Sequence, residues 1–266
     1  MPFLQIAYKR IHYADHKPPD STPTREIFIL IHGLGSSQNY YGAIVPALTA
    51  HGFRCIALDT TGAGRSPYTQ VEQSIESLAG DVVGVMEKLG VEKGVVVGHS
   101  MGGIIAAHLA ATRPSLVTAA VLIGPVYPSS AVADVFSKRI ALVEKEGMEA
   151  MANTIPYAAV GKAASPLVKA FIRELLLGQD AAGYISNCRV IAGARPPAFG
   201  DVKAPVLILA GEEDKSAPLE GCKKMVGELG SEVKRLEVLE GCGHWHCLEK
   251  WEAVGEKIVE FWDQIQ

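Results

Sequence analysis

The stretch Gly98-His99-Ser100-Met101-Gly102 lies between residues 93–97, which end in three valines, and residues 103–110, which are good helix formers. A strand, a tight turn and a helix in this order predict that the Ser100 hydroxyl is exposed above the edge of a sheet. The main chains approach each other closely in such a turn, and the glycines on either side leave room for that approach. The pattern therefore predicts a serine nucleophile held in a strained backbone.

Length and charge narrow the class of protein. With 266 residues the chain can bury a large core, and a single α/β domain with an insertion is ordinary at this length. A formal net charge of -4 offers no basic surface, so nucleic acid is not an expected partner. No apolar run approaches the roughly 20 residues of a membrane span, and residues 1–5 lack the pattern of a signal peptide. We expect a cytoplasmic protein that does not act at a membrane.

The cysteines show no disulfide framework. There are five, an odd number, and their spacing is irregular, which favours reduced thiols. Two cysteines and two histidines fall within residues 242–247, but their spacing matches no usual zinc pattern. The sequence therefore predicts no metal site.

Strand and helix patterns alternate along most of the chain, which is typical of a mostly parallel sheet covered on both faces. Residues 4–13 alternate weakly and predict one leading antiparallel strand. Residues 27–31 are continuously apolar, as expected of a strand buried on both faces. Further strands are predicted at 54–58, 93–97, 118–123, 205–209 and 233–239, with helices at 40–50, 75–89, 103–112 and 248–265.

The alternation breaks after residue 128. Residues 129–197 contain only helical patterns, among them the spacing of Val132, Phe136 and Ile140 and a helix start at Ser165-Pro166. We interpret residues 129–197 as a helical lid (cap), inserted into a core domain formed by residues 1–128 and 198–266.

A serine hydroxyl is a poor nucleophile at neutral pH and needs a base that is oriented by a carboxylate. Asp214 and His244 each follow a predicted strand, in the chain order serine, acid, histidine. Because the carboxyl ends of parallel strands meet at one edge of a sheet, we assign Ser100, Asp214 and His244 as the catalytic triad. The alternatives left open are Glu212 and Glu213 for the acid and His246 for the base.

Acyl transfer at a serine also requires main-chain N–H groups that stabilise the developing oxyanion. Met101, directly after the nucleophile, is one expected donor. The second is expected from the loop at residues 32–37, where Leu34 lies between two glycines. His32 in the same loop is interpreted as a residue that holds the loop in place.

These motifs together resemble the α/β-hydrolases over nearly the whole chain. The matching stretches are His32-Gly33-Leu34-Gly35, residues 59–66, residues 98–103, Gly211-Glu212-Glu213-Asp214 and Gly241-Cys242-Gly243-His244. The resemblance implies the α/β-hydrolase fold: an eight-stranded, mostly parallel sheet flanked by helices, with a helical lid after the sixth strand. It also implies that residues 59–66 form a structural turn beside the active site.

Residues 147–152 and 183–192 are similar to lid segments of 3-oxoadipate enol-lactonases and other small lactone or ester hydrolases. This likeness implies cleavage of a small lactone or carboxylic ester through an acyl-enzyme on Ser100, without a cofactor. His99 and residues 241–245 are equally typical of C–C hydrolases that act on meta-cleavage products, so that reaction is an alternative. A slow-turnover ligand receptor of the same fold is another. Ser100 argues against dehalogenation and epoxide opening, which use an aspartate nucleophile in this fold.

The expected partner is a small-molecule ester or lactone, and a homodimer is left open. An anionic lactone would require a cation, for which Arg189 and Arg195 are the candidates. Tyr157 is a candidate for the lining of an apolar pocket, and Trp245, beside the base, for a substrate contact. The competing interpretation is a solvated surface charge for the two arginines, packing between lid helices for Tyr157, and a packing residue beside the base for Trp245.

Overall fold

The strands of the chain form an eight-stranded sheet in the computed structural model, which describes residues 2–266. Their spatial order is β1-β2-β4-β3-β5-β6-β7-β8. The second strand runs antiparallel to both of its neighbours, and all the other neighbouring strands are parallel. The strands are β1 (Phe3–Ile6), β2 (Lys9–His16), β3 (Glu26–Ile31), β4 (Phe53–Leu58), β5 (Gly94–His99), β6 (Val117–Ile123), β7 (Val206–Gly211) and β8 (Lys234–Leu239).

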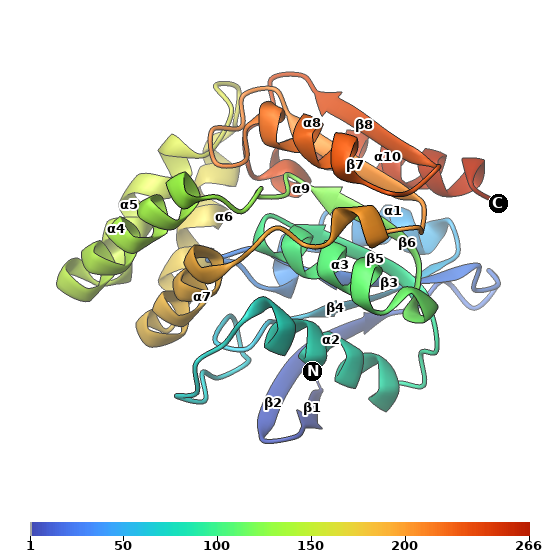
Figure 1. The fold of residues 1–266 in the computed structure, drawn as a ribbon, viewed down its shortest axis with the longest axis horizontal. Helices are drawn as coiled ribbons and strands as arrows, with labels where there is room; N and C mark the ends of the chain where they lie inside the picture. Colours follow the sequence, from blue (N-terminus) through green and yellow to red (C-terminus); the bar gives the residue numbers. More distant parts are fainter. Residues whose placement is uncertain (1) are drawn as a thin grey trace.

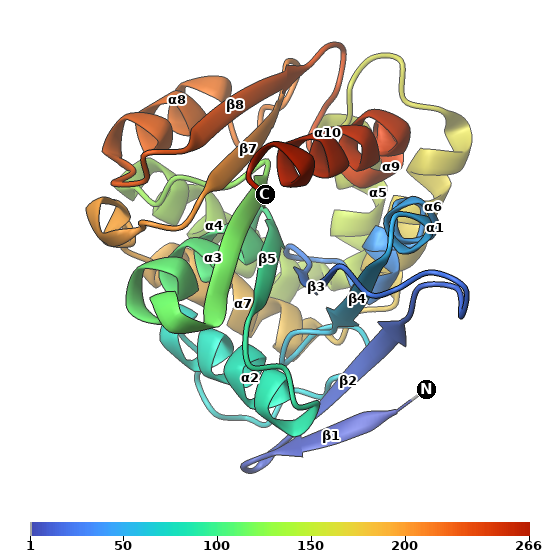
Figure 2. The same cartoon turned by 90° about the vertical axis from the view of Figure 1, so that its right-hand side faces the viewer.

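Helices cover both faces of this sheet, as the continuous apolar runs of the central strands require. Every residue of β5 is buried. Figure 2 shows α2 (Ile75–Lys88), α3 (Met101–Thr112) and α8 (Leu219–Glu228) on one face, and α1 (Val45–Ala50) and α10 (Trp251–Gln264) on the other. The predicted fold, a mostly parallel eight-stranded sheet flanked by helices, is confirmed.

Four α-helices lie between β6 and β7 and form a group beside the sheet (Figure 1). Side-chain caps start three of them, because the Ser129, Ser165 and Asp180 side chains accept main-chain N–H groups of the first turns. The division into a core domain and a lid at residues 129–197 stays a prediction; we use "lid helices" for these four. They are α4 (Ser130–Glu146), α5 (Met148–Ala158), α6 (Pro166–Leu177) and α7 (Ala181–Gly193).

The expectation of a single strand at residues 4–13 is wrong. The chain turns back at Ala7, where φ is +51°, so that β1 and β2 form an antiparallel hairpin. The turn carries no glycine and therefore gave no signal in the sequence. The C-terminal helix is likewise broken at Lys250, between α9 (His246–Glu249) and α10.

The predicted helix at residues 40–50 is also interrupted. Residues Gln38–Tyr41 form a 3₁₀ turn, and α1 begins only at Val45. Pro46 lies in the first turn of α1. The N–H groups of a first turn have no partner within the helix, so the missing N–H of proline costs no hydrogen bond there.

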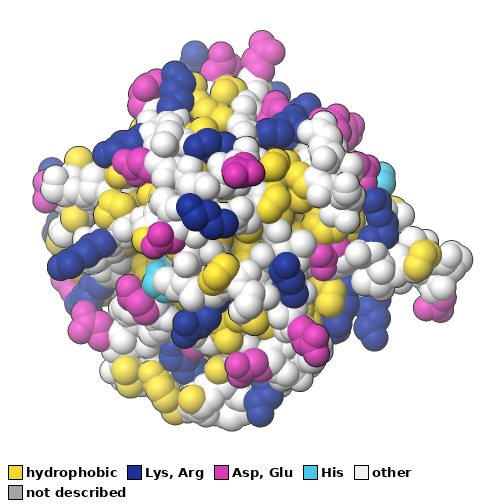
Figure 3. Space-filling view, turned by 45° about the vertical axis from the view of Figure 1, so that its right-hand side comes forward, with side chains coloured by type: hydrophobic (Ala, Val, Ile, Leu, Met, Phe, Trp, Pro, Cys, Tyr) yellow, Lys and Arg dark blue, Asp and Glu magenta, His cyan; other side chains and the backbone are white. Residues whose placement is uncertain are grey.

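Charged side chains of both signs are mixed on the molecular face in Figure 3. Among residues 2–266, no helix has the length and apolar character needed to cross a lipid bilayer. The same residues contain no group of three or more His, Cys, Asp or Glu side chains placed to hold a metal ion.

Candidate active site

Ser100 lies in the turn between β5 and α3 with φ +55° and ψ −113°, a backbone conformation that is strained for any residue with a Cβ. Its N–H donates to the carbonyl oxygen of Ile123 over 3.0 Å, which fixes the turn to β6. A Cβ on Gly98 would collide with the carbonyl oxygen of Gly102. The glycines of the motif are thus required by close main-chain approach, as predicted.

Two loops bring a histidine and a carboxylate to this serine. His244 Nε2 lies 3.0 Å from Ser100 Oγ, and His244 Nδ1 lies 2.8 Å from Asp214 Oδ2. The other carboxylate oxygen of Asp214 accepts the N–H groups of Ser216 and Ala217, each at 2.8 Å. The structure therefore brings together the three residues assigned from the sequence, in the geometry of a nucleophile, a base and an orienting acid.

The electrostatic setting of Asp214 favours its ionised form. Burial by itself would raise the pKa of this carboxyl group. The charge and hydrogen bond of His244, the charge of His246 and the N–H of Ala217 together outweigh burial and lower the pKa below its ordinary value. An ionised Asp214 is what stabilises a protonated His244.

The alternative acids and base have other partners. Glu212 accepts the N–H of Gly241 over 2.8 Å, and Glu213 accepts the N–H of Lys162 over 2.8 Å. His246 is fully buried and donates from Nδ1 to the main-chain carbonyl oxygen of His244. These three residues support the loops around the triad and do not replace its members.

The predicted oxyanion donors lie next to the nucleophile. Met101 is the first residue of α3, and Leu34 lines the same cavity as Ser100. Neither N–H donates to an acceptor anywhere in residues 2–266, so both are free for a ligand oxygen. The loop that carries Leu34 passes close above the nucleophile, because a Cβ on Gly33 would lie 2.8 Å from the Cβ of Ser100.

His32 holds this loop in place, as expected. Its buried ring donates from Nδ1 to the carbonyl oxygen of Gly33 over 2.7 Å, and its Nε2 accepts the N–H of Thr60 over 3.1 Å. Burial lowers the pKa of His32, despite the nearby charge of Asp59.

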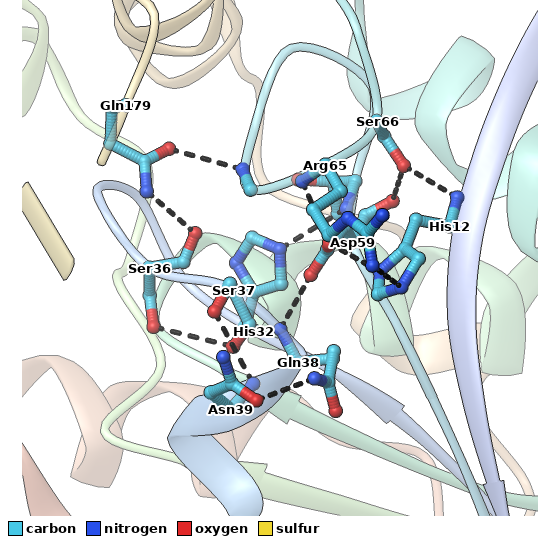
Figure 4. Close-up of polar contacts among 12 residues, drawn as sticks. His12, His32, Ser36, Ser37, Gln38, Asn39, Asp59, Arg65, Ser66 and Gln179 are labelled. Atoms are coloured by element: carbon cyan, nitrogen blue, oxygen red, sulfur yellow. Dashed lines mark hydrogen bonds and ion pairs between the residues drawn. The ribbon is translucent and has the colours of Figure 1, made fainter. Parts of the chain in front are cut away.

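A second polar network fastens the neighbouring turn at residues 59–66 (Figure 4). The Asp59 carboxylate accepts the N–H groups of Gln38 and Arg65 at 2.7 and 2.9 Å and contacts His12 Nδ1 at 2.8 Å. Gln179, between α6 and α7, donates to the carbonyl oxygen of Ser36 over 3.1 Å. The network serves the structural role that the family resemblance implies, and it ties the lid helices to the loop at residues 32–37.

A cavity of about 310 Å³ opens above Ser100, between the core and the lid helices. This volume is at the small end of the roughly 300–1,000 Å³ of ligand pockets. A larger cavity of about 600 Å³ lies between α6 and the C-terminal helices, but no triad residue lines it. We therefore take the smaller cavity as the candidate site. It is lined by Leu34, Ser100, Val126, Ala131, Val132, Val135, Phe136, Arg139, Ile155, Ala159, Leu176, Tyr184, Lys215, Ser216, Pro218, His244 and Trp245.

Four residues were predicted as candidate substrate contacts, and one of them lines this cavity. Tyr157, Arg189 and Arg195 do not line it. Trp245 is buried and lies in its wall. Tyr157 is 69% exposed, because α5 turns the adjacent Pro156 inward, and its ring packs under Lys169. The structure therefore places Tyr157 outside this cavity, and a substrate contact by Tyr157 stays a prediction.

Arg189 likewise lies outside the cavity, and its predicted contact with an anionic substrate stays a prediction. The buried face of α7 carries Tyr184, Cys188 and Ile191, at helical spacing. Arg189 is rotated out of that face, is 52% exposed and pairs with Glu144 of α4 at 3.6 Å.

Lys215 and Arg139 of α4 line the cavity, and the sequence analysis missed both. Arg139 contacts two aromatic side chains of the lid helices. Its guanidinium lies 4.8 Å from the ring centroid of Phe136 and close enough to the Tyr184 hydroxyl to oppose the rise in pKa that burial causes there. Within residues 2–266, no Asp or Glu pairs with Arg139 and none lines the cavity. The position of Arg139 in the sequence could have predicted that it lines the cavity, because it follows Phe136 by three residues and so lies on the predicted inner face of the helix.

Comparison with known proteins agrees with the fold. Residues 26–204 match the family described as alpha/beta hydrolase fold, and the chain belongs to this family. The enol-lactonase from Burkholderia xenovorans LB400 superposes with a TM-score of 0.90 and 26% identity, over 98% of this chain and 100% of that one. The resemblance inferred from the motifs is thereby confirmed.

Other matches are named for different substrates. A 2-hydroxy-6-oxo-6-phenylhexa-2,4-dienoate hydrolase from Comamonas testosteroni is 29% identical over 261 residues, covering 89% of this chain and 87% of the relative. A thermophilic esterase from Thermogutta terrifontis shares the fold, with a TM-score of 0.85 and 22% identity over 97% and 94% of the two chains. These relatives are hydrolases, but their substrates differ.

Proposed function

We propose that the protein is a serine hydrolase that cleaves a small lactone or carboxylic ester through an acyl-enzyme on Ser100. The observation that carries this proposal is the hydrogen-bonded series Ser100–His244–Asp214, with distances of 3.0 and 2.8 Å, at the base of a small cavity. The likeness to an enol-lactonase over the whole chain supports the choice of substrate class.

In the proposed reaction, Ser100 Oγ attacks the substrate carbonyl carbon while His244 Nε2 takes the hydroxyl proton. The resulting imidazolium is stabilised by the Asp214 carboxylate at Nδ1. The N–H groups of Leu34 and Met101 donate to the tetrahedral oxyanion. His244 then protonates the leaving alkoxide, and the same base activates the water that releases the acid from Ser100.

The charge in the cavity indicates an anionic substrate. Arg139 and Lys215 line the cavity, and no Asp or Glu of residues 2–266 lines it. A guanidinium that pairs with no carboxylate of the protein is available to a substrate carboxylate, which it binds in a bidentate geometry. We therefore propose a lactone or ester that carries a carboxylate, with Arg139 rather than Arg189 as its binding residue.

Hydrolysis of a C–C bond is the second candidate, because the relative from Comamonas testosteroni is named for such a substrate. A receptor that is acylated by its ligand but turns over slowly is the third. The C–C hydrolase and the receptor would both use Ser100. Substrate preference and turnover number distinguish them from a lactone or ester hydrolase.

The deciding experiment is steady-state hydrolysis of a substrate panel by the wild type and by Ser100→Ala. The panel contains p-nitrophenyl acetate to octanoate, plain and carboxylated lactones, and a meta-cleavage diketone. The proposal expects many turnovers on a carboxylated lactone or ester and no activity above background for Ser100→Ala. Faster turnover of the diketone would favour C–C hydrolysis, and a few turnovers on every compound would favour a receptor. Equal activity of Ser100→Ala would overturn the mechanism.

A further inference from the structure

The carboxylate of Glu249, at the end of α9, accepts hydrogen bonds from three main-chain N–H groups. One oxygen accepts from Gly161 at 2.7 Å and from Gly243 at 3.0 Å, and the other accepts from Trp245 at 2.9 Å. Gly243 and Trp245 are the neighbours of His244 on either side. Gly161 belongs to the segment between α5 and α6, 88 positions away from Glu249.

A second hydrogen bond joins the segment between α5 and α6 to the turn that contains His244. The N–H of His244 donates to the carbonyl oxygen of Ala159 over 2.8 Å. The contact is backbone against backbone, because a Cβ on Gly243 would collide with the N–H of Gly161, and a Cβ on Gly161 with the carbonyl oxygen of Gly241. The segment Ala159–Gly161 and the turn Gly243–Trp245 thus form one junction, with the Glu249 carboxylate as its bridging group.

This junction determines where the His244 ring can lie. The ring reaches Ser100 and Asp214 at the same time, so a small rotation of its main chain would lengthen one of the two bonds. Hydrogen bonds to a carboxylate are stronger than those between neutral groups, and Glu249 is only partly exposed. Fixing the N–H groups before and after His244 restrains the φ and ψ angles that aim its side chain.

We propose that Glu249 is a positioning residue for His244, which couples docking of the lid segment Ala159–Gly161 to alignment of the base. The proposal rests on the proposed role of His244 as the base in ester or lactone hydrolysis. Glu249 does not touch the reacting atoms, and its effect on the reaction is exerted through the main chain of residues 243–245.

Glu213 provides a matched control. Its carboxylate accepts the N–H of Lys162, the residue that follows Gly161, over 2.8 Å. It therefore binds the same lid segment as Glu249, but its carboxylate accepts no N–H group beside His244. Glu213→Gln weakens a lid contact alone, whereas Glu249→Gln also replaces one acceptor oxygen at the His244 turn by an NH₂ group.

The experiment compares wild type, Glu249→Gln, Glu249→Asp and Glu213→Gln in p-nitrophenyl acetate hydrolysis, with thermal unfolding to establish that each variant is folded. For Glu249→Gln we expect kcat to fall by about tenfold or more with KM within about twofold, since a misplaced base slows chemistry more than binding. The low-field NMR signal of the His244 Nδ1 proton, hydrogen-bonded to Asp214, should shift or broaden. Glu213→Gln should retain both the rate and the signal.

The proposal is overturned if folded Glu249→Gln keeps the wild-type kcat and NMR signal, or if Glu213→Gln loses as much activity. Should Glu249→Gln not fold, Glu249→Asp decides, because its shorter carboxylate cannot span all three N–H groups; wild-type kcat in this variant would overturn the proposal. Ser100→Ala is measured in the same assay. Activity in Ser100→Ala would contradict the proposed function, whereas the Glu249 variants test only the role of Glu249.

Discussion

The ring of His99 donates from Nε2 to the main-chain carbonyl oxygen of His244 over 2.8 Å, although the two residues are 145 positions apart. His246 donates from Nδ1 to the same oxygen over 2.9 Å. Burial, reinforced by the neighbouring histidines, lowers the pKa of His99 well below its ordinary value. Both rings are therefore neutral donors behind the base, and the main chain of His244 is held at its carbonyl as well as at its N–H.

Buried neutral histidines make stability dependent on pH. Burial lowers the pKa of His246 from 6.5 to about 4, against the opposing charge of Asp214. Between these two pH values the unfolded chain binds a proton that the native protein does not. The free energy of unfolding should thus fall as the pH falls from 6.5 towards 4, by up to about 1.4 kcal/mol per pH unit for this residue.

The measurement is urea unfolding between pH 7 and pH 4 for wild type, His246→Asn and the surface control His51→Asn. The slope should be smaller in His246→Asn, which keeps an N–H donor but cannot titrate, and unchanged in His51→Asn. The pKa of Asp214 is lowered in the native state, so its contribution to the free energy of unfolding is lost only at more acidic pH. Asp214 therefore does not account for a slope between pH 6.5 and pH 4. Equal slopes in all three proteins would contradict the prediction.

Replacing Asp214 by asparagine should leave the fold intact and remove most of the activity. The asparagine side chain cannot stabilise a protonated His244 and favours the wrong tautomer of the ring, so kcat should fall by roughly 10³–10⁴-fold with a small change in KM. Glu212→Gln is the control, since Glu212 binds the N–H of Gly241. A similar loss in Glu212→Gln, or near-normal kcat in Asp214→Asn, would refute the assignment of the acid.

Arg139→Met should raise KM selectively for anionic substrates. Loss of one charge-assisted contact of about 1.5–3 kcal/mol corresponds to a tenfold or larger rise in KM. The test pairs a p-nitrophenyl ester of a dicarboxylic acid with a neutral ester of equal length, and it includes Arg189→Met as the exposed control. The neutral ester should be unaffected, and Arg189→Met should resemble wild type. If Arg139→Met weakens both esters equally, Arg139 contributes to packing of α4 rather than to charge recognition.

Local sequence patterns were sufficient where neighbouring residues determine the structure. The turn at Ser100 could be predicted because its strand, its glycines and its helix are contiguous. Asp214 and His244 could be placed because parallel strands deliver their following loops to one edge of the sheet. The hairpin at Ala7 was missed, since its turn lacks the residues that mark such turns.

The lid side chains could be predicted less well. Helical periodicity shows that a lid helix has a buried face, but which face meets the cavity depends on how the four helices pack on one another and on the core. For this reason Tyr157 and Arg189 were assigned to the cavity and Arg139 was not. The bridging role of Glu249 depends on a contact with Gly161 that no local pattern contains.

The sequence by itself thus determined the turn at Ser100, the alternation of strands and helices, and which three side chains meet at the edge of the sheet, because each depends on short-range geometry or on the order of strands. Only the tertiary structure decided which cations line the cavity and how the His244 turn is joined to the lid helices. Those features arise from packing between segments far apart in the chain, where side-chain direction is set by the neighbouring element and not by the residues on either side.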